Sequence, residues 1–475
     1  MGMLLVGITI VLAGAAAEEG VRFENFDQDP GWDGQNNRSQ APLREVKQDF
    51  GYVPPTPEGG ASGRIGGTIT PDGVPAFYAM EIPAKTFDDA MTASGTIEVP
   101  KGAGNTLLGF FNAETVNEWR TPNTIVFRIN SRGDIFHVHF EYGTAKWRAN
   151  AGVIGRVDKE ADRVYPLELP CGEEYPWSLS YDPAGNNGNG IITATFGEVM
   201  AECNLSEGHR TDSARFNRFG ILNVNKSVDS SGDLWLSDLS VLGNPVNLSA
   251  DPQWIGLRNH ETYLSAEIRP RFDFGYSPTH YAGGKASGEI GGLHFRGDCR
   301  YPVKMAYYGA KTEPLRLEKP LHASGTIVLR RGVSDSTTYF GFFHHEHSIR
   351  SNPEQRSGLP EDFLGLAVEG PSAEGFFVYP TWRAHEGVEN HTSGYGPARI
   401  YPDGAPHTWT LDYAPPTGEG PGELRLTLDG NEVTVPVDAE ALSVAHFNRL
   451  GFVTAWIDGN GQRVYIDDLR YTENQ

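Results

Sequence analysis

One short segment of this chain carries residue types that can move protons. The segment Phe136–Glu141 alternates apolar and polar residues, and in a β-strand such alternation places successive side chains on opposite faces. His137, His139 and Glu141 would then share one face. Imidazole and carboxylate groups on one surface accept and donate protons near neutral pH, which is general acid–base chemistry.

A second segment, Ile125–Asn130, would add a cation to that face. Its alternation places Arg128 and Asn130 together, and a guanidinium beside an amide can clamp an anionic group. If the two strands adjoin and their polar sides point into a groove, the surface combines acid–base groups with an anion clamp. The alternative is the solvated outer face of a sheet, with no ligand.

Glutamates stand at corresponding positions, Glu114 and Glu346, after a Gly-Phe-Phe motif that occurs twice. Each is either a sugar-binding or catalytic carboxylate or a structural residue common to both places. Strand alternation would send His344 and His347 to opposite sides, which disfavours a metal ion held by the histidines around Glu346. The candidate catalytic residues are therefore Glu141, His137, His139, Glu114, Glu346 and His344.

Other polar and aromatic residues suit the recognition of sugars. Amides and guanidinium groups match paired hydroxyls and carboxylates, and an aromatic ring stacks on the apolar side of a pyranose. Four tryptophans, Trp32, Trp177, Trp254 and Trp409, lie in strand-like contexts and are expected in the core. The residues expected to contact a sugar are Asn36, Asn37, Arg38, Arg120, Asn123, Arg128, Asn130, Trp147, Arg148, Tyr165, Asn259, His260, Trp382, Arg383 and Tyr401.

A long internal repeat organises these residues. The motifs recur in the same order with similar spacing, so the chain contains two copies of one sequence unit. The repeated elements are Asp29-Pro-Gly-Trp32 and Asp251-Pro-Gln-Trp254, Asp49-Phe-Gly-Tyr52 and Asp273-Phe-Gly-Tyr276, Gly109-Phe-Phe111 and Gly341-Phe-Phe343, and Trp147-Arg-Ala149 and Trp382-Arg-Ala384. The predicted division is a signal peptide over 1–17, a first domain over 18–245 and a second domain over 246–475.

Each copy consists of short alternating or β-branched runs separated by Gly, Pro, Asn and Asp, and helical periodicity is nearly absent. The clearest predicted strands are Ala93–Val99, Thr124–Asn130, Asp134–Tyr142 and Glu423–Val437. About 220 residues of strand without helix favour a two-sheet sandwich. The predicted fold class is all-β, with two tandem jelly-roll β-sandwich domains.

The length of each unit, its strand pattern and the closing segment Arg463–Tyr471 with its pair of aspartates resemble the concanavalin A-like lectin and glucanase superfamily. The resemblance implies a glycoside hydrolase, a polysaccharide lyase or a sugar-binding module. It also implies a structural calcium near the closing strand, with Asp238 and Asp468 as its candidate ligands. The chain lacks the Glu-x-Asp-x-x-Glu and Gln-Ile-His motifs of laminarinases and alginate lyases, so no catalytic residue can be transferred from those enzymes.

Charge and the N-terminal segment limit the expected partners and location. A formal net charge of −22 argues against nucleic acid, because phosphate binding needs clustered Lys and Arg. The run Met1–Leu12 is too short to span a bilayer, and Ala15-Ala-Ala17 fits a signal cleavage site, although no basic residue precedes it. We expect a secreted protein, extracellular or periplasmic, without a membrane anchor. The oligomeric state stays open.

Cys171 and Cys203 flank a predicted strand, turn and strand centred near Asn187. A hairpin would place the two cysteines opposite each other, so a disulfide is one expectation and two reduced thiols are the alternative. Cys299 would remain unpaired.

These features favour a secreted enzyme that cleaves a polysaccharide or oligosaccharide by hydrolysis or by β-elimination, and the histidines and arginine of the first copy slightly favour a substrate that contains uronic acid. Hydrolysis would use two carboxyl groups, and elimination a proton acceptor with a cation that neutralises the uronate. The rival interpretations are a tandem sugar-binding or adhesion protein, in which two linked sites raise avidity, and a structural matrix protein.

Overall fold

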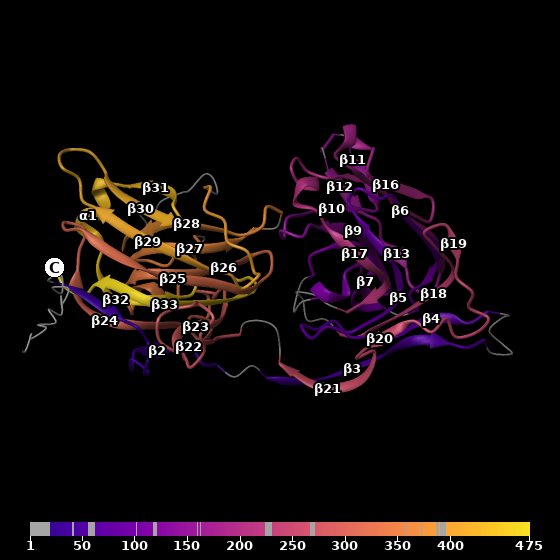
Figure 1. Ribbon diagram of the computed structural model, residues 1–475, viewed down its shortest axis with the longest axis horizontal. Helices are drawn as coiled ribbons and strands as arrows, with labels where there is room; N and C mark the ends of the chain where they lie inside the picture. The colour runs from indigo at the N-terminus through magenta and orange to yellow at the C-terminus, as the bar shows by residue number, and fades with distance from the viewer. Residues whose placement is uncertain are drawn as a thin grey trace, which may run out of the picture.

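The computed structural model describes residues 20–475 except 40–41, 56–61, 101, 117–120, 159, 162, 224–229, 267–270, 356, 372, 386–388 and 390–395. Two β-sandwiches lie side by side (Figure 1). The predicted fold class, all-β with two tandem sandwiches, is confirmed. Among the described residues no helix is both long and apolar enough to cross a membrane.

The first sandwich contains two sheets, which we call sheet I and sheet II. Sheet I runs in the order β10 (Ala149–Val153), β9 (Ile135–Gly143), β8 (Thr124–Gly133), β7 (Gly102–Phe111), β17 (Arg215–Leu222), β5 (Phe77–Thr86) and β20 (Ile255–Leu257), with β13 (Leu169–Pro170) on β9. Sheet II runs in the order β16 (Val199–Asn204), β15 (Ile191–Phe196), β14 (Glu174–Asp182), β6 (Met91–Glu98), β18 (Gly232–Val241), β4 (Arg64–Ile69), β3 (Leu43–Val53) and β21 (His260–Ala266), with β19 (Asn244–Pro245) on β18.

The second sandwich repeats this arrangement in sheets III and IV. Sheet III runs in the order β2 (Asp33–Gln35), β24 (Tyr307–Leu315), β32 (Phe447–Val453), β26 (Ser336–Phe343), β27 (Phe363–Gly370) and β28 (Phe377–Arg383). Sheet IV runs in the order β22 (Asp273–Ser277), β23 (Glu289–Phe295), β33 (Gly461–Thr472), β25 (Leu321–Gly332), β29 (Pro406–Ala414), β30 (Gly422–Leu428) and β31 (Asn431–Val437), with β1 (Val21–Glu24) on β33.

The remaining elements are short connections. They are the hairpin of β11 (Gly155–Asp158) and β12 (Arg163–Pro166), the helix α1 (Ala439–Val444), and the 3-10 turns η1 (Ala113–Thr115), η2 (Asn186–Gly188), η3 (Arg210–Asp212), η4 (Pro302–Lys304) and η5 (His347–Ile349). Apolar side chains that alternate along the strands meet between the two sheets of each sandwich. Trp177 in the first core and Trp409 in the second are buried as predicted.

The leading segment of each repeat joins the other sandwich. From the first repeat, β1 pairs with β33 and β2 pairs with β24, both in the second sandwich. From the second repeat, β20 pairs with β5 and β21 pairs with β3, both in the first. The boundary at 245/246 therefore divides the repeats of the sequence, whereas the sheets follow a different division. The two crossing segments run antiparallel beside each other, as β3 and β21 show in Figure 1.

The same hydrogen bonds fasten both crossing segments. The Asn37 side chain donates to the Phe274 carbonyl (2.6 Å), and the Phe274 N–H donates to the Asn37 carbonyl (2.9 Å). Asn259 and Phe50 make the corresponding two bonds at 2.6 and 2.9 Å. Each repeat thus supplies the asparagine that closes the other sandwich.

The predicted disulfide is wrong, since all three cysteines are free. The strand, turn and strand between Cys171 and Cys203 exist as β14, η2 and β15, but Cys203 lies on a third strand, β16. There it stands opposite Ile192 rather than Cys171. Burial raises the pKa of the Cys203 thiol to about 11.

Candidate functional site

Strands β8 and β9 bring the predicted acid–base residues together. In their antiparallel register Arg128 lies opposite His139 and Asn130 lies opposite His137. The alternate residues Phe136, Val138 and Phe140 point into the core, so the polar side chains lie on the outward face of sheet I. We call Arg128, Asn130, His137, His139 and Glu141 the polar face; its predicted composition is confirmed.

Neighbouring groups determine the charge state of His139 and the tautomer of His137 on the polar face. The Nε of Arg128 lies 3.6 Å from Oε2 of Glu141. Burial, and then the Arg128 charge, lower the pKa of His139 to about 4, so this imidazole is neutral at neutral pH. The Nδ1–H of His137 donates to the Leu167 carbonyl at 2.9 Å, which leaves Nε2 as a proton acceptor.

Two residues that sequence reasoning missed belong to the same surface. Asn105 on β7 lies opposite Asn130 in the ladder and is buried, and Arg132 continues the outward row of β8. Arg132 could have been found by extending the alternation of β8 by one step. Asn105 could not, because its place depends on the pairing of β7 with β8.

The other half of this outward face, around β5, β7 and β17, is apolar. A separate cluster covers it, made of Phe77, Ala79, Leu107, Phe111, Val126 and Leu222. Next to this cluster, Arg218 on β17 pairs with Glu81 on β5 at 2.9 Å, whereas the polar face defined above occupies the β8–β9 side of sheet I.

The described residues of the second sandwich form no comparable polar face. The outward face of sheet III is buried under a cluster of Cys299, Met305, Tyr307, Tyr339, Phe343, Ile349, Phe363, Ala367, Val453, Ala455 and Trp456. Gly143 and Arg383 hold equivalent ladder places, opposite Thr124 and Phe363. The counterparts of His137, His139 and Glu141 on β28 are therefore Phe377, Tyr379 and Thr381.

The second sandwich instead gathers imidazoles where strands of sheet III end. We call His344, His347, His385, His446 and Asp362 the histidine cluster. His344 follows β26, Asp362 precedes β27, His385 follows β28 and His446 precedes β32. The ring centroids of His344 and His347 are 3.9 Å apart, and those of His347 and His385 are 4.8 Å apart.

Burial dominates the electrostatics of this cluster. It lowers the pKa of His344 to about 4, with a further contribution from His347, and it also lowers the pKa of His446. Asp362 is fully buried and accepts a hydrogen bond from Nδ1 of His347 at 2.6 Å. His347, Asp362 and His385 offer three ligand atoms within 4.8 Å of one another, so these residues form a group that can hold a metal ion.

This group contradicts the argument by which strand alternation disfavoured a metal ion among these histidines. The prediction assumed a continuous strand through His344–His347, but β26 ends at Phe343 and His347 begins η5. Alternation therefore does not apply. Sequence reasoning also missed Asp362 and His385, which lie far along the chain from His347.

The two aligned glutamates lie apart from the polar face. Glu114 is an exposed residue of η1, and its backbone N–H is capped by the Asn112 side chain. The carboxylate of Glu346 is 71% exposed and faces His345 at 3.6 Å. The structure therefore does not join Glu141, Glu114 and Glu346 into a paired-carboxylate site.

Five predicted sugar-binding residues serve the crossing segments instead. Asn37 and Asn259 hold the backbone as described above, and Asn36 donates to the Met305 carbonyl at 2.8 Å. Arg38 pairs with Asp273 at 2.7 Å and His260 with Asp49 at 3.1 Å. The structure uses these polar atoms between the repeats.

The two Trp-Arg pairs are not equivalent in space. Trp382 is buried on β28, and its Nε1 donates to the Pro436 carbonyl at 2.7 Å. Arg383 is only 2% exposed and donates to the Leu359 carbonyl. A sugar cannot stack on either side chain, so this prediction is wrong.

Trp147 and Arg148 connect the two sandwiches. The Trp147 ring packs on Phe376 of the second sandwich, with centroids 6.1 Å apart. Arg148 pairs with Asp212 at 2.5 Å and lies 3.8 Å from Glu374. Tyr401 is half-buried and contributes to the charge environment of Arg148. The structure therefore uses Trp147 and Arg148 in the contact between the sandwiches, and a sugar-binding role for Tyr401 stays a prediction.

The last predicted binding residues have separate places. Tyr165 is exposed on β12. Asn123 is buried and accepts a hydrogen bond from the Arg215 N–H at 3.1 Å. Arg120 lies outside the described residues, as does the predicted signal peptide.

The two candidate calcium ligands differ. Asp238 is exposed, and its Oδ2 accepts from Thr96 at 3.4 Å. Asp468 is half-buried beside the buried Asp467, whose pKa burial raises to about 6. Within the described part of the chain, neither aspartate belongs to a group of three converging ligands, so calcium here stays a prediction.

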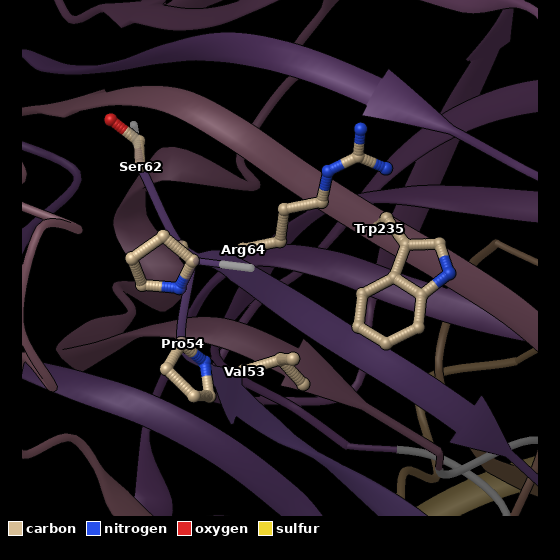
Figure 2. A pocket seen from close by; sticks show the side chains of 7 residues that line it. Val53, Pro54, Ser62, Arg64 and Trp235 are labelled. Atoms are coloured by element: carbon tan, nitrogen blue, oxygen red, sulfur yellow. The ribbon is translucent and has the colours of Figure 1, made fainter. Parts of the chain in front are cut away.

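A cavity of about 300 Å³ opens on sheet II, away from the polar face and the histidine cluster (Figure 2). Its lining includes Val53, Pro54, Arg64 and Trp235, and the view shows Arg64 extending beside the Trp235 ring. Arg64 pairs with Glu98 at 2.6 Å and lies 3.5 Å from Glu174. Its charge is therefore balanced by carboxylates, and the described lining residues include no acid–base group comparable to the polar face.

No protein-family model and no curated protein matches this chain. Solved structures similar to it include domains LG4–5 of the mouse laminin α1 chain, at 11% identity over 88% of this chain and 92% of that one, with a TM-score of 0.24. An endo-β-1,4-glucuronan lyase from the fungus Trichoderma reesei matches at 13% identity over 49% and 98%, with a TM-score of 0.22. An endo-1,3-β-glucanase from Streptomyces sioyaensis matches at 13% identity over 40% and 78%, with a TM-score of 0.24.

These structures include members of the concanavalin A-like superfamily that the sequence resembles. That fold is shared by glycanases, lyases and non-catalytic lectin or adhesion domains. At these identities and TM-scores the likeness carries no argument about activity.

Proposed function

We propose that the chain is a secreted enzyme that binds an acidic polysaccharide on the polar face of the first sandwich and cleaves it by β-elimination. The observation that carries the proposal is the set of groups on one outward surface: a guanidinium, two imidazoles and two amides around a single carboxylate. Arg132, exposed on the same row of β8, adds a second guanidinium, so the surface carries two cations against one carboxylate in a chain of net charge −22. An anionic substrate is the ligand that such a contrast favours.

Three residues take roles in the proposed elimination. Arg128 and Asn130, two residues apart on β8, can hold the uronate carboxylate by charge-assisted hydrogen bonds. His137, opposite Asn130, has its Nδ1–H committed to the Leu167 carbonyl, so Nε2 can take the proton α to that carboxylate. The glycosidic carbon–oxygen bond then breaks, a carbon–carbon double bond forms, and the leaving oxygen takes up a proton.

Hydrolysis with two carboxylates receives less support, because Glu141 is the single carboxylate of the polar face and Glu114 and Glu346 lie elsewhere. Non-catalytic binding of the same polysaccharide is the second candidate. It needs the anion clamp of Arg128 and Asn130 but no proton acceptor, so activity separates it from elimination.

The test measures ultraviolet absorbance of the unsaturated product and release of reducing ends on a panel of polyuronates and neutral glucans. We expect absorbance on a polyuronate with the wild-type chain. His137→Gln should lower kcat by about 100-fold or more, as expected for loss of a general base, while Arg128→Met mainly raises KM. His260→Gln, far from the polar face, is the matched control and should stay active.

Two outcomes count against elimination. Reducing ends without absorbance would indicate hydrolysis. Retention in polyuronate affinity gels without any product would indicate a binding protein. Circular dichroism of each variant shows whether a loss reflects the site or the fold.

A further inference from the structure

The two repeats have the same backbone conformation just before β8 and β27, but they carry different side chains there. Asn123 and Asp362 precede these strands with left-handed φ values of 58° and 48°. In each, Oδ1 accepts a backbone N–H, from Arg215 at 3.1 Å and from His446 at 3.2 Å. The Oδ1 atom of this residue therefore has the same structural role in both sandwiches.

The other terminal atom of that side chain differs in chemistry. In the first sandwich Nδ2 of Asn123 donates to the Thr115 hydroxyl at 3.1 Å. In the second, Oδ2 of Asp362 faces Nδ1 of His347 at 2.6 Å. Where the first sandwich has an amide and a hydroxyl, the second has a carboxylate and an imidazole. Only the second pair consists of groups that bind transition metals.

His385 brings a third donor atom to this pair. Its Nδ1 lies 3.8 Å from Oδ2 of Asp362 and 3.5 Å from Oε2 of Glu361. That nitrogen is buried and has no hydrogen-bond partner among the described residues. A buried nitrogen acceptor aimed at a fully buried carboxylate is costly unless something lies between them.

We propose that His347, Asp362 and His385 bind one divalent transition-metal ion of the zinc class. Two imidazole nitrogens and one carboxylate oxygen form a donor set that zinc accepts and that calcium, which prefers oxygen ligands, does not. Tetrahedral zinc with bonds of about 2.0–2.2 Å sets donor atoms roughly 3.3 Å apart. The 2.6 Å contact of His347 with Asp362 must widen, and the 3.8 Å contact of His385 must shorten, by less than 1 Å each.

Neighbouring groups hold this donor set in place. Glu361 pairs with Arg350 and with Arg383, the latter at 3.3 Å, so its charge is compensated and it stands outside the set. His344 stacks on His347, and the His446 N–H orients Asp362. The bound ion would connect the loops after β26 and β28 to the start of β27. Three protein ligands leave a coordination position for water.

The test uses the tag-free full-length chain, stripped with a chelator and titrated with Zn²⁺. We expect one ion per chain by calorimetry and mass spectrometry, and a rise in Tm of the chain on binding. Co²⁺ in place of Zn²⁺ should give the visible absorption of a tetrahedral site. Ca²⁺ should give neither effect, which separates this site from the predicted calcium.

Asp362→Asn installs the residue of the first sandwich and keeps the Oδ1 bond to His446, so the chain should fold without the ion. His385→Gln should also abolish binding. His345→Gln, adjacent in sequence but outside the donor set, should bind as the wild type does. Absence of zinc binding by the wild-type chain, or undiminished binding by both Asp362→Asn and His385→Gln, would overturn the proposal, whatever the outcome for polysaccharide cleavage.

Discussion

The imidazole of His294 lies between the rings of Phe274 and Phe452, each centroid 4.3 Å away. The residue is 3% exposed, and burial lowers its pKa to about 3. The unfolded chain binds this proton below about pH 6.5, whereas the folded chain binds it only near pH 3. Stability of the second sandwich therefore falls as the pH drops from about 6.5 towards 3.

His294→Ile should remove most of this acid sensitivity, because Ile69 holds the corresponding place on β4 in the first sandwich. A depressed pKa of this size corresponds to a loss of about 2 kcal/mol in the wild-type chain between neutral pH and pH 5. Urea unfolding at both pH values measures the difference. If the free energy of unfolding of His294→Ile falls between the two pH values as much as that of the wild type, His294 is not the cause of the acid sensitivity. His345→Gln is the control for the loss of an imidazole as such.

Single residues also show which parts of the site could be predicted from the sequence and which could not. Alternation alone placed Arg128, His137 and Glu141 on one surface, because the period of a strand is local information. It did not find Asp362 or His385, since their meeting with His347 depends on how three strand ends pack. The shared Trp-Arg motif misled the alignment, because Trp382 lies within β28 and Trp147 follows β9.

At the scale of elements, the exchanged leading segments are fastened by an asparagine in each repeat. Asn37→Ala should destabilise the second sandwich and Asn259→Ala the first, each by about 1–2 kcal/mol, since each change leaves a backbone carbonyl without its donor. Hydrogen–deuterium exchange should rise in β22 for Asn37→Ala and in β3 for Asn259→Ala. Asn25→Ala, which removes an exposed hydrogen bond from the Asp27 N–H in the first crossing segment, is the control. Faster exchange in the same sandwich for both variants would contradict the exchange of segments.

The strands themselves were predictable, and their partners were not. The runs Thr124–Asn130 and Asp134–Tyr142 became β8 and β9 almost as predicted, and Glu423–Val437 became the hairpin of β30 and β31. The two copies of the Asp-x-x-Trp element are nearly identical in sequence. Trp32 packs on Tyr308 of the second sandwich and Trp254 on Tyr78 of the first, a choice that identical motifs cannot specify.

For the whole molecule, the exchange means that the repeats and the folded units have different boundaries. A fragment of residues 43–266 contains every strand of the first sandwich, including β20 and β21. A fragment of residues 18–245, cut at the repeat boundary, lacks β20 and β21 and carries β1 and β2, whose partners β33 and β24 are missing. Without Trp254 and Asn259, this second fragment loses contacts with Tyr78 and Phe50.

We therefore expect fragment 43–266 to be a monomer that unfolds cooperatively, and fragment 18–245 to melt about 10 °C lower. That difference follows from the loss of two strands and of the half-buried Trp254, which together cost roughly 3–5 kcal/mol in a domain of this size. Because its unpaired strands can be satisfied only by another chain, fragment 18–245 should also self-associate. Light scattering with size exclusion and thermal unfolding measure both properties. Equal stability and a monomeric state for both fragments would show that each repeat closes its own sandwich without the exchanged segments.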